Sequence, residues 1–418
     1  MKYPFYIFKF GGASIRNALA VRKVADIIRQ NRDKKILIVV SAMGKTTNAL
    51  ERAVQSRLSG KDFKVELDSI SKFHQEIMTD LFEKSSAVWQ KVASEFEKIH
   101  LSLTGNLPPA QLYDQVVSRG EVLSSIVVSE FLNAEGMDVV WIDSTQYIIT
   151  DETYQEGNVD WLATERKIAF LKPLMENNMI LTQGFIGGNP LGYTTTLGRE
   201  GSDYSAAIFG SCLDVESVTI WKDVPGVMNA DPKRIPEAVA FKELPFREAA
   251  VMTYYGASVI HPKTIKPLAN KNIPLLVKNF DDPTLPGTII RETKVEHLPP
   301  LIVFKENQCL VSCRVTDYTF INEQQLSHIF QSLSDLNLKI NVMQNSAISF
   351  SFCVDYREEP LLLLVERLAA QFEVYYNTGL TLITIKNYDA VTADRYRKKA
   401  GVLLEQSSRS TLQVLLRN

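Results

Sequence analysis

The sequence has few cysteines, and none of them has a spacing typical of metal binding. Its 418 residues include four cysteines, Cys212, Cys309, Cys313 and Cys353, with no CxxC pair and no cluster of cysteine and histidine. Disulfide scaffolds and cysteine-ligated zinc sites need more cysteines or closer spacings. We therefore expect structural thiols in a reducing compartment.

Long apolar runs and an excess of one charge are also missing. No stretch reaches the roughly 18 uncharged apolar residues that a membrane-spanning helix requires. The 46 lysines and arginines nearly balance the 48 aspartates and glutamates, so the net charge is −2. Such a chain has no overall field that would attract nucleic acid or an anionic membrane. We expect a soluble, cytoplasmic, unexported protein without either partner, which binds any phosphate locally.

Glycine and proline are scarce enough to exclude collagen-like and disordered classes. The chain has 20 glycines and 17 prolines, and 45% of its residues are hydrophobic. These values are typical of globular proteins. At roughly 150 residues per domain, the length predicts two or three domains.

Apolar strands alternate with helices over residues 1–296. The expected strands are 4–10, 36–40, 137–142, 179–185, 217–221 and 273–277. Uniformly apolar strands separated by helices are typical of a parallel sheet covered on both faces, with ligands at the carboxyl ends of its strands. A charged helical lobe at about 49–115 is inserted, and we expect its histidines on the surface.

The pattern changes after the segment His297-Leu-Pro-Pro300. We expect a strand at 301–316, a helix at 323–336, strands within 338–354 and a helix at 361–372. A strand pair within 374–386, a helix near 393–400 and a strand at 411–416 follow. This βαββαβ pattern predicts two ferredoxin-like α+β modules within 300–418.

Two polar loops follow the first two strands. Lys9-Phe-Gly-Gly-Ala-Ser14 is either a phosphate-binding turn, with a lysine and close backbone N–H groups, or a tight turn beside an incidental lysine. Gly44-Lys-Thr-Thr47 looks like the end of a P-loop, but the first glycine of that motif would fall at Val39. A helix cap at Thr47 is the favoured interpretation, and a ligand contact is the alternative.

Charged groups in two later loops have both a structural and a binding interpretation. Glu121 is either a charge in the first turn of a helix, which the sequence alone favours, or a partner for a substrate ammonium group. Arg199 offers a bidentate fork for a carboxylate, and Asp203 could orient Lys9. Alternatively, Ser202 or Asp203 caps the helix expected at 206–212.

The segment 221–233 follows another strand and contains Asp223, Asp231 and Lys233. Aspartates before glycine or proline usually form turns. The alternative is a nucleotide pocket in which carboxylates bind ribose hydroxyls and Lys233 binds a phosphate.

Taken together, the motifs of this chain resemble the aspartokinases, a branch of the amino-acid kinase family. The tail is similar to the paired ACT domains of those enzymes at 372–374 and 404–409. The matching motifs stand in the family's order: Lys9-Phe-Gly-Gly-Ala-Ser, Ser41-Ala-Met-Gly-Lys-Thr-Thr, Arg119-Gly-Glu121, Gly184-Phe-Ile-Gly187, Gly198-Arg-Glu-Gly-Ser-Asp203-Tyr-Ser-Ala, Trp221-Lys-Asp-Val-Pro-Gly, Asp231-Pro-Lys, Gly256-Ala-Ser-Val-Ile-His-Pro262 and Pro286-Gly-Thr288.

The resemblance implies an amino-acid kinase domain at 1–296 and paired regulatory ACT domains at 300–418. It also implies ATP-dependent phosphorylation of L-aspartate to 4-phospho-L-aspartate, the first step towards lysine, threonine and methionine. The expected enzyme is monofunctional, because the sequence ends at Asn418 without a dehydrogenase.

The resemblance also assigns roles to individual residues. Lys9 stabilises the transferring phosphoryl group, and Asp203 orients that lysine. The residues expected to bind aspartate are Thr47, Glu121, Phe185, Arg199 and Ser202. Those expected to bind ATP are Lys9, Gly11, Gly12, Lys222, Asp223, Met228, Lys233 and Ser258. No protein ligand for a metal is expected, since Mg²⁺ would sit on the ATP phosphates.

Several positions differ from the family pattern. Ala13, Glu200, Lys222 and Ser258 stand where threonine, glycine, threonine and lysine are common, so nucleotide affinity is expected to differ. The ACT-like segments 316–323 and 345–348 also depart from it. Feedback by lysine or threonine is therefore a hypothesis, and a homodimer through the ACT domains is the expected assembly. The alternatives are another amino-acid kinase, a non-catalytic amino-acid sensor and a structural scaffold.

Overall fold

The computed structural model describes residues 4–256, 260–295, 297–316 and 319–417. The chain divides into two compact units. The first unit comprises Met1–Val227, Ala240–Ala250 and Val259–Val295, and the second comprises Met228–Val239, Val251–Ser258 and Glu296–Asn418.

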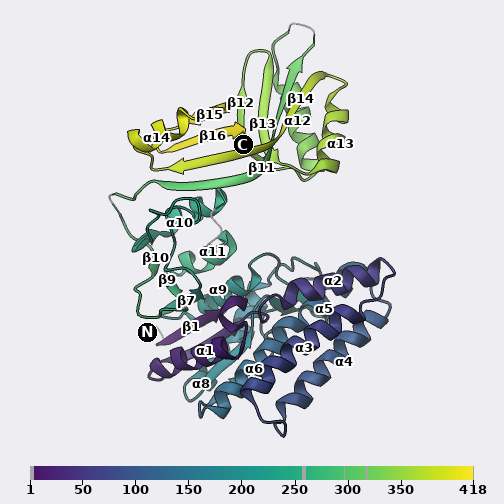
Figure 1. The fold of residues 1–418 in the computed structure, drawn as a ribbon, viewed down its shortest axis with the longest axis vertical. Helices are drawn as coiled ribbons and strands as arrows, with labels where there is room; N and C mark the ends of the chain where they lie inside the picture. Colours follow the sequence, from purple (N-terminus) through teal and green to yellow (C-terminus); the bar gives the residue numbers. More distant parts are fainter. Residues whose placement is uncertain (1–3, 257–259, 296, 317–318, 418) are drawn as a thin grey trace. The chain divides into compact units, whose positions relative to one another are not determined.

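An eight-stranded sheet forms the centre of the first unit (Figure 1). Its order is β3 (Val139–Trp141), β4 (Met179–Gln183), β2 (Lys35–Val40), β1 (Phe5–Phe10), β7 (Ser217–Lys222), β9 (Leu275–Asn279), β10 (Thr288–Arg291) and β8 (Glu243–Pro245). Neighbouring strands run parallel except β9 and β10, which are antiparallel. A separate hairpin joins β5 (Ile186–Gly188) to β6 (Thr194–Thr196). The predicted α/β class is confirmed.

Helices cover both faces of this sheet because the central strands are apolar on both sides. Phe8 and Phe10 belong to a core shared with α1 (Ala18–Gln30) and α6 (Arg119–Ala134). Ile7 is just as buried but points to the other face by strand alternation, where α9 (Gly201–Leu213) packs against β1. Helices α7 (Trp161–Ala169) and α11 (Pro262–Asn270) pack against α9 in turn.

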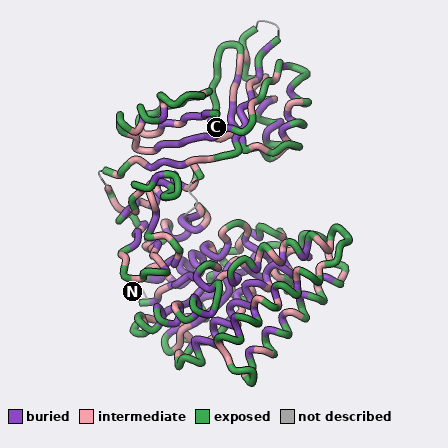
Figure 2. Tube along the Cα trace, viewed as in Figure 1, coloured by how far each residue is buried: buried purple, intermediate pink, exposed green. Residues whose placement is uncertain are grey.

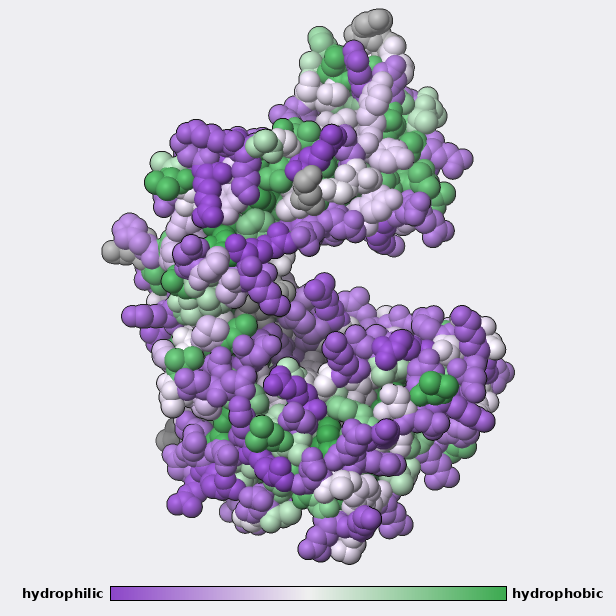
Figure 3. Space-filling model, viewed as in Figure 1, coloured by the Kyte–Doolittle hydropathy of each residue, from purple (hydrophilic) through white to green (hydrophobic). Residues whose placement is uncertain are grey.

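The predicted helical lobe is a bundle of helices beside α6 (Figure 1). It contains α2 (Thr46–Leu58), α3 (Lys64–Leu81), α4 (Val88–Thr104) and α5 (Pro109–Val117). Buried and exposed residues alternate along these helices (Figure 2), and hydrophilic side chains cover most of their visible face (Figure 3). Each helix therefore buries one stripe of residues.

The remaining short elements of the first unit connect these layers. They are the 3₁₀ turns η1 (Gly12–Ile15) and η2 (Ser144–Gln146), and α8 (Lys172–Met175). Helix α10 (Phe246–Tyr254) begins in the first unit and ends in the second. In the described part of the chain, no helix is both long and apolar enough to cross a membrane.

Two local predictions are wrong in the first unit, and four short strands were missed. His74 is buried, packed edge to face against Phe73 and Phe96, and burial lowers its pKa to about 4. Helix α2 begins at Thr46 after Lys45, so Thr47 lies in the first turn and is not the cap. The short strands β5, β6, β8 and β10 were not predicted, because three or four residues carry too weak a period-two pattern.

One six-stranded antiparallel sheet forms the centre of the second unit. Its order is β12 (Ile340–Asn345), β13 (Ser349–Asp355), β11 (Leu301–Val315), β14 (Phe372–Lys386), β16 (Thr411–Arg417) and β15 (Val402–Ser407). The predicted strand pair within 374–386 is wrong, since β14 is one strand of 15 residues. Strand β15 was also missed.

Strands β11 and β14 are long enough to serve two ferredoxin-like modules. The first module uses the later half of β11, the first half of β14, β12, β13, α12 (Glu323–Asp335) and α13 (Glu358–Leu368). The second uses the other halves with β15, β16 and α14 (Ala390–Arg397). The second module's core includes Ala230 and Ile235, so a segment distant in sequence completes it. The predicted α+β modules are confirmed.

Candidate active site

A pocket of about 690 Å³ opens at the carboxyl ends of β1, β2, β4 and β7. Parallel sheets of this kind usually bind ligands at that edge. The lining residues include Lys9 from β1, Lys222 from β7, Glu121 from α6 and Asp203 from α9. Four elements far apart in sequence therefore bring charged groups into one cavity.

Strand alternation explains why the two lysines reach the same place. Lys9 pairs in register with Ile220 of β7, and Phe10 pairs with Trp221, whose ring stacks on it at 6.0 Å. Because successive side chains alternate between faces, Lys222 emerges on the same face as Lys9. That face is the one on which α9 packs.

Asp203 accepts both lysines in a buried ion triad. Lys9 Nζ lies 2.6 Å from Asp203 Oδ1, and Lys222 Nζ lies 3.1 Å from Asp203 Oδ2. The side chains of Lys9 and Asp203 are 9% and 3% exposed. Burial alone would raise the pKa of Asp203, but the two ammonium groups outweigh it and hold that pKa below its usual value. The triad carries two positive charges and one negative charge.

Glu121 lines the same pocket and is also almost completely buried. Ser202 Oγ donates to Glu121 Oε2 at 3.3 Å. Burial raises the pKa of Glu121 to about 8, against the opposing effects of a backbone hydrogen bond from Ala42 and the charge of Lys9. A buried carboxyl group poised in this way gains stability when a cation binds it.

Two glycines allow the loops of the site to touch. A Cβ on Gly184 would lie 2.5 Å from Ser202 Cβ, and a Cβ on Gly201 would lie 2.6 Å from the Phe185 ring. No side chain fits at such distances. Glycine at both positions therefore brings the β4 loop against the start of α9.

Backbone strain occurs at the same contact. Phe185 and Glu200 have φ values of 67° and 54°, in the left-handed region that glycine favours. The Phe185 N–H donates to Ser205 Oγ at 2.9 Å, which helps to hold that conformation. Strain of this kind is often found at functional sites. Glu200 takes the N-cap position of α9 without a side-chain cap bond, so the alternative interpretation of Ser202 or Asp203 as the cap is wrong.

The structure brings most of the predicted site residues together. Nine of them line the pocket: Lys9, Gly12, Thr47, Glu121, Phe185, Arg199, Ser202, Asp203 and Lys222. Gly11 adjoins it, since a Cβ there would lie 3.5 Å from Lys9 Nζ.

The other predicted nucleotide contacts do not line this pocket. Asp223 is exposed and lies outside the lining. Met228 and Lys233 belong to the second unit, and the Lys233 N–H donates to Asp231 Oδ1 at 2.9 Å, as in a turn. Ser258 lies outside the described residues.

Sequence reasoning missed Asp114, a fully buried carboxylate behind the pocket. It accepts the backbone N–H of Gln155 at 3.0 Å and that of Thr196 at 2.9 Å, and Thr196 Oγ1 donates to it at 2.8 Å. Burial is the main reason that its pKa is raised. Asp114 thereby ties α5 to Gln155, which lines the pocket, and to β6, which leads into the Arg199 loop.

Other missed lining residues include Tyr113 and Glu51, whose side chains hydrogen-bond at 2.6 Å. Both residues lie within helices and belong to no motif, so nothing in the sequence indicated that they line a pocket. The position of Asp114 five residues before the Arg119-Gly-Glu121 motif is the one signal that could have suggested it.

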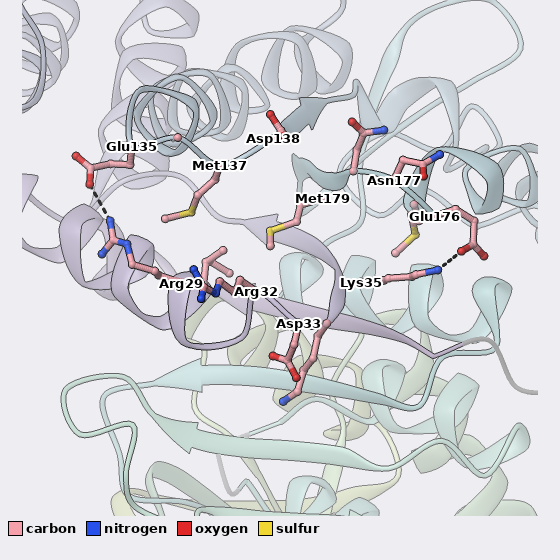
Figure 4. A pocket seen from close by; sticks show the side chains of 15 residues that line it. Arg29, Arg32, Asp33, Lys35, Glu135, Met137, Asp138, Glu176, Asn177 and Met179 are labelled. Carbon is pink, nitrogen blue, oxygen red and sulfur yellow. Dashed lines mark hydrogen bonds and ion pairs between the residues drawn. The ribbon is translucent and has the colours of Figure 1, made fainter.

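A second cavity, of about 530 Å³, lies at the opposite edge of the sheet (Figure 4). Its charged groups include two ion pairs, Arg29 with Glu135 and Lys35 with Glu176, and all four side chains are at least 34% exposed. Exposed pairs of this kind contribute about 0–1 kcal/mol each. The carboxyl edge therefore has the buried, unbalanced charge that chemistry requires.

Comparison with known proteins identifies the family. Residues 4–279 match the amino acid kinase family. This chain belongs to that family. It is 29% identical to the lysine-sensitive aspartokinase 3 of Escherichia coli over 412 residues, which cover 96% of this chain and 90% of that protein.

Solved structures and longer relatives extend the comparison. The crystal structure of E. coli aspartokinase III with aspartate and ADP superposes with a TM-score of 0.83 at 26% identity, covering 99% of this chain and 96% of that one. The complex of that enzyme with lysine and aspartate gives 0.81 at 25%, with the same coverage. The bifunctional aspartokinase/homoserine dehydrogenase of carrot is 28% identical over 89% of this chain, which spans only 42% of that relative.

Proposed function

We propose that this family member is an aspartokinase, which transfers the γ-phosphoryl group of ATP to the side-chain carboxylate of L-aspartate. The observation that carries the proposal is the juxtaposition of the Lys9–Asp203–Lys222 triad with the buried carboxyl group of Glu121 in one pocket. The similarity to aspartokinase III, whose structure contains aspartate and ADP, supports the same substrates. The product would be 4-phospho-L-aspartate, a precursor of lysine, threonine and methionine.

The acceptor needs no general base, because the side-chain carboxylate of aspartate is already ionised at neutral pH. Two anions must instead be brought together and their charge neutralised. Lys9 and Lys222 supply two ammonium groups, and Asp203 fixes their positions. Gly11 and Gly12 would supply backbone N–H donors to phosphate oxygens.

Glu121 and residues near it would orient the aspartate substrate. Glu121 binds the α-ammonium group of aspartate. This ion pair stabilises the ionised form of Glu121 and so offsets the effect of burial, which raises its pKa. Arg199 is exposed at the rim of the pocket and binds the α-carboxylate through its planar fork. Thr47, Phe185 and Ser202 complete the contacts with aspartate.

ATP would occupy the side of the pocket next to Lys222, and Asp223, Met228, Lys233 and Ser258 remain proposed nucleotide contacts. A Mg²⁺ ion would neutralise the phosphate oxygens and be held mainly by them and by water. The chemistry of the donors fits that arrangement, because the carboxylate of Asp203 is already engaged by both lysines.

Regulation and assembly extend the proposal. An amino-acid effector, lysine or threonine, would act through the ferredoxin-like modules, which would also form a homodimer in the cytoplasm. The lysine-sensitive E. coli relative and its complex with lysine support lysine as the first effector to test.

The test measures both products of the reaction. ADP release is followed in a coupled assay with ATP, Mg²⁺ and aspartate, and hydroxylamine traps the acyl phosphate as a hydroxamate. We expect both signals with aspartate, and neither with glutamate, N-acetylglutamate or UMP. Turnover of one of those acceptors without turnover of aspartate would overturn the substrate assignment, and absence of all turnover would favour a sensor.

A further inference from the structure

A third cavity in the first unit lies between α7, α9 and α11, apart from the pocket described above. It has a volume of about 600 Å³, within the range of about 300–1,000 Å³ that small-molecule sites usually have. Residues that line it include Trp161 of α7, Tyr204 and Ser211 of α9, and Lys266 of α11. The proposed reaction uses none of these side chains.

The charge of the cavity wall is entirely positive. Lys263, Lys266 and Lys271 line it, and no acidic residue does. Lys263 and Lys271 form ion pairs with Glu156 and Glu165, which stand outside the lining. Within the described residues Lys266 forms no ion pair. A wall with three lysines and no carboxylate attracts an anion. Lys266 is best placed to bind it, because no ion pair in the described residues neutralises its charge.

The opposite wall is aromatic. The Trp161 and Tyr204 rings meet edge to face with their centroids 6.5 Å apart, and Trp161 is 41% exposed. An indole beside a cavity offers a flat surface on which a nucleobase or a similar ring can stack. Asn158, Asn270 and Ser211 add hydrogen-bonding groups.

We propose that this cavity binds a small effector in which a phosphate group is attached to a flat heterocyclic ring, as in a nucleoside monophosphate. The ring stacks on Trp161, and the phosphate lies against Lys266 with Lys263 and Lys271 on either side. This combination uses both the cationic wall and the aromatic wall. A free phosphate or a free nucleoside satisfies only one of them.

The cavity shares two elements with the catalytic pocket. Tyr204 directly follows Asp203 in α9. The same turn of this helix therefore lines both the catalytic pocket and the third cavity. Gln155 lines the catalytic pocket, whereas Gly157 and Asn158 line this cavity. Glu156 lies between them and pairs with Lys263. A phosphate that draws Lys263 away from Glu156 therefore changes the loop that carries Gln155.

Calorimetric titration of the full chain with AMP, without aspartate or ATP, tests this inference independently of the proposed function. We expect saturable AMP binding at least tenfold tighter than that of inorganic phosphate or adenosine. Lys266→Ala and Trp161→Leu should each weaken AMP binding about tenfold. Lys167→Ala, an exposed lysine of α7 outside the lining, is the matched control and should leave it unchanged.

A Lys9→Ala variant separates the two pockets. AMP binding that survives in Lys9→Ala and is weakened in Lys266→Ala supports the third cavity. Binding lost in Lys9→Ala but intact in Lys266→Ala would assign AMP to the catalytic pocket and overturn the inference. No saturable binding, or equal affinity for phosphate, adenosine and AMP, would overturn it as well. Thermal unfolding of each variant checks that the substitutions leave the fold intact.

Discussion

The two edges of the central sheet use charge in different ways. At the carboxyl edge, Lys9 and Asp203 are almost completely buried, and Asp203 serves two lysines. At the amino edge, around the cavity of Figure 4, Arg29 pairs with Asp26 and Glu135, and Lys35 pairs with Glu176; all five side chains are at least 34% exposed. Similar residue types at the two edges therefore have different energies, because only the buried ones lose their water.

The largest expected contrast is in catalysis. Lys9→Ala removes a buried cation from the site of phosphoryl transfer, so we expect kcat to fall on the order of 10³-fold. Lys35→Ala at the amino edge is the control and should leave kcat unchanged. Both are measured by ADP release, with circular dichroism to check folding. Near-normal turnover in Lys9→Ala would remove that lysine from the mechanism.

Asp203→Asn should come next, because it removes the one negative charge that holds two ammonium groups. We expect kcat to fall about 100-fold and the free energy of unfolding to fall by about 1–3 kcal/mol. Glu176→Gln breaks an exposed pair at the amino edge and should change stability by less than about 0.5 kcal/mol. Urea denaturation measures both variants, and equal effects on stability would contradict the contrast between the edges.

Glu121 gives a prediction about pH. Its folded-state pKa is about 8, raised from 4.5 by burial, so between those values the folded chain binds more protons than the unfolded chain. Stability without ligand should therefore fall as pH rises from about 5 to 8. Glu121→Gln should remove this part of the slope in thermal unfolding, and it should raise KM for aspartate about tenfold to a hundredfold. An unchanged slope and KM would show that Glu121 does neither.

The smallest expected effect concerns positioning behind the pocket. Asp114→Asn replaces one acceptor oxygen by a donor facing the N–H groups of Gln155 and Thr196. We expect KM for aspartate to rise about 2- to 12-fold with little change in kcat, because the rim shifts while the triad remains. Asp138→Asn, which lines the amino-edge cavity, is the control. A fall in kcat with constant KM would argue against positioning.

Prediction from the sequence was accurate for features that depend on short stretches of consecutive residues. The motifs after the apolar strands and the family resemblance assigned Lys9, Arg199 and Asp203 to one site, and all three line the same pocket. It was inaccurate where a contact comes from a distant segment. Strand β14 was divided in two because most of its first half is exposed, which weakens the apolar pattern there, although β11 pairs along both halves of β14.

The nucleotide contacts show the same limit. Asp223 and Lys233 follow one strand and were assigned together, yet they belong to different units. Asp114 carried no motif of its own, and its importance is visible only because Gln155 and Thr196, 41 and 82 residues away, donate to it.

The sequence by itself determined the order of the longer helices and the main apolar strands, the absence of a bulk charge and the motifs that indicate the family. These are properties of neighbouring residues, fixed by side-chain period and composition. Only the tertiary structure decided that Lys222 joins Lys9 on Asp203, that Glu121 is buried enough to raise its pKa to about 8, and that three lysines face Trp161 and Tyr204 across a separate cavity. Burial and charge coupling depend on residues brought together from distant positions, which no local pattern records.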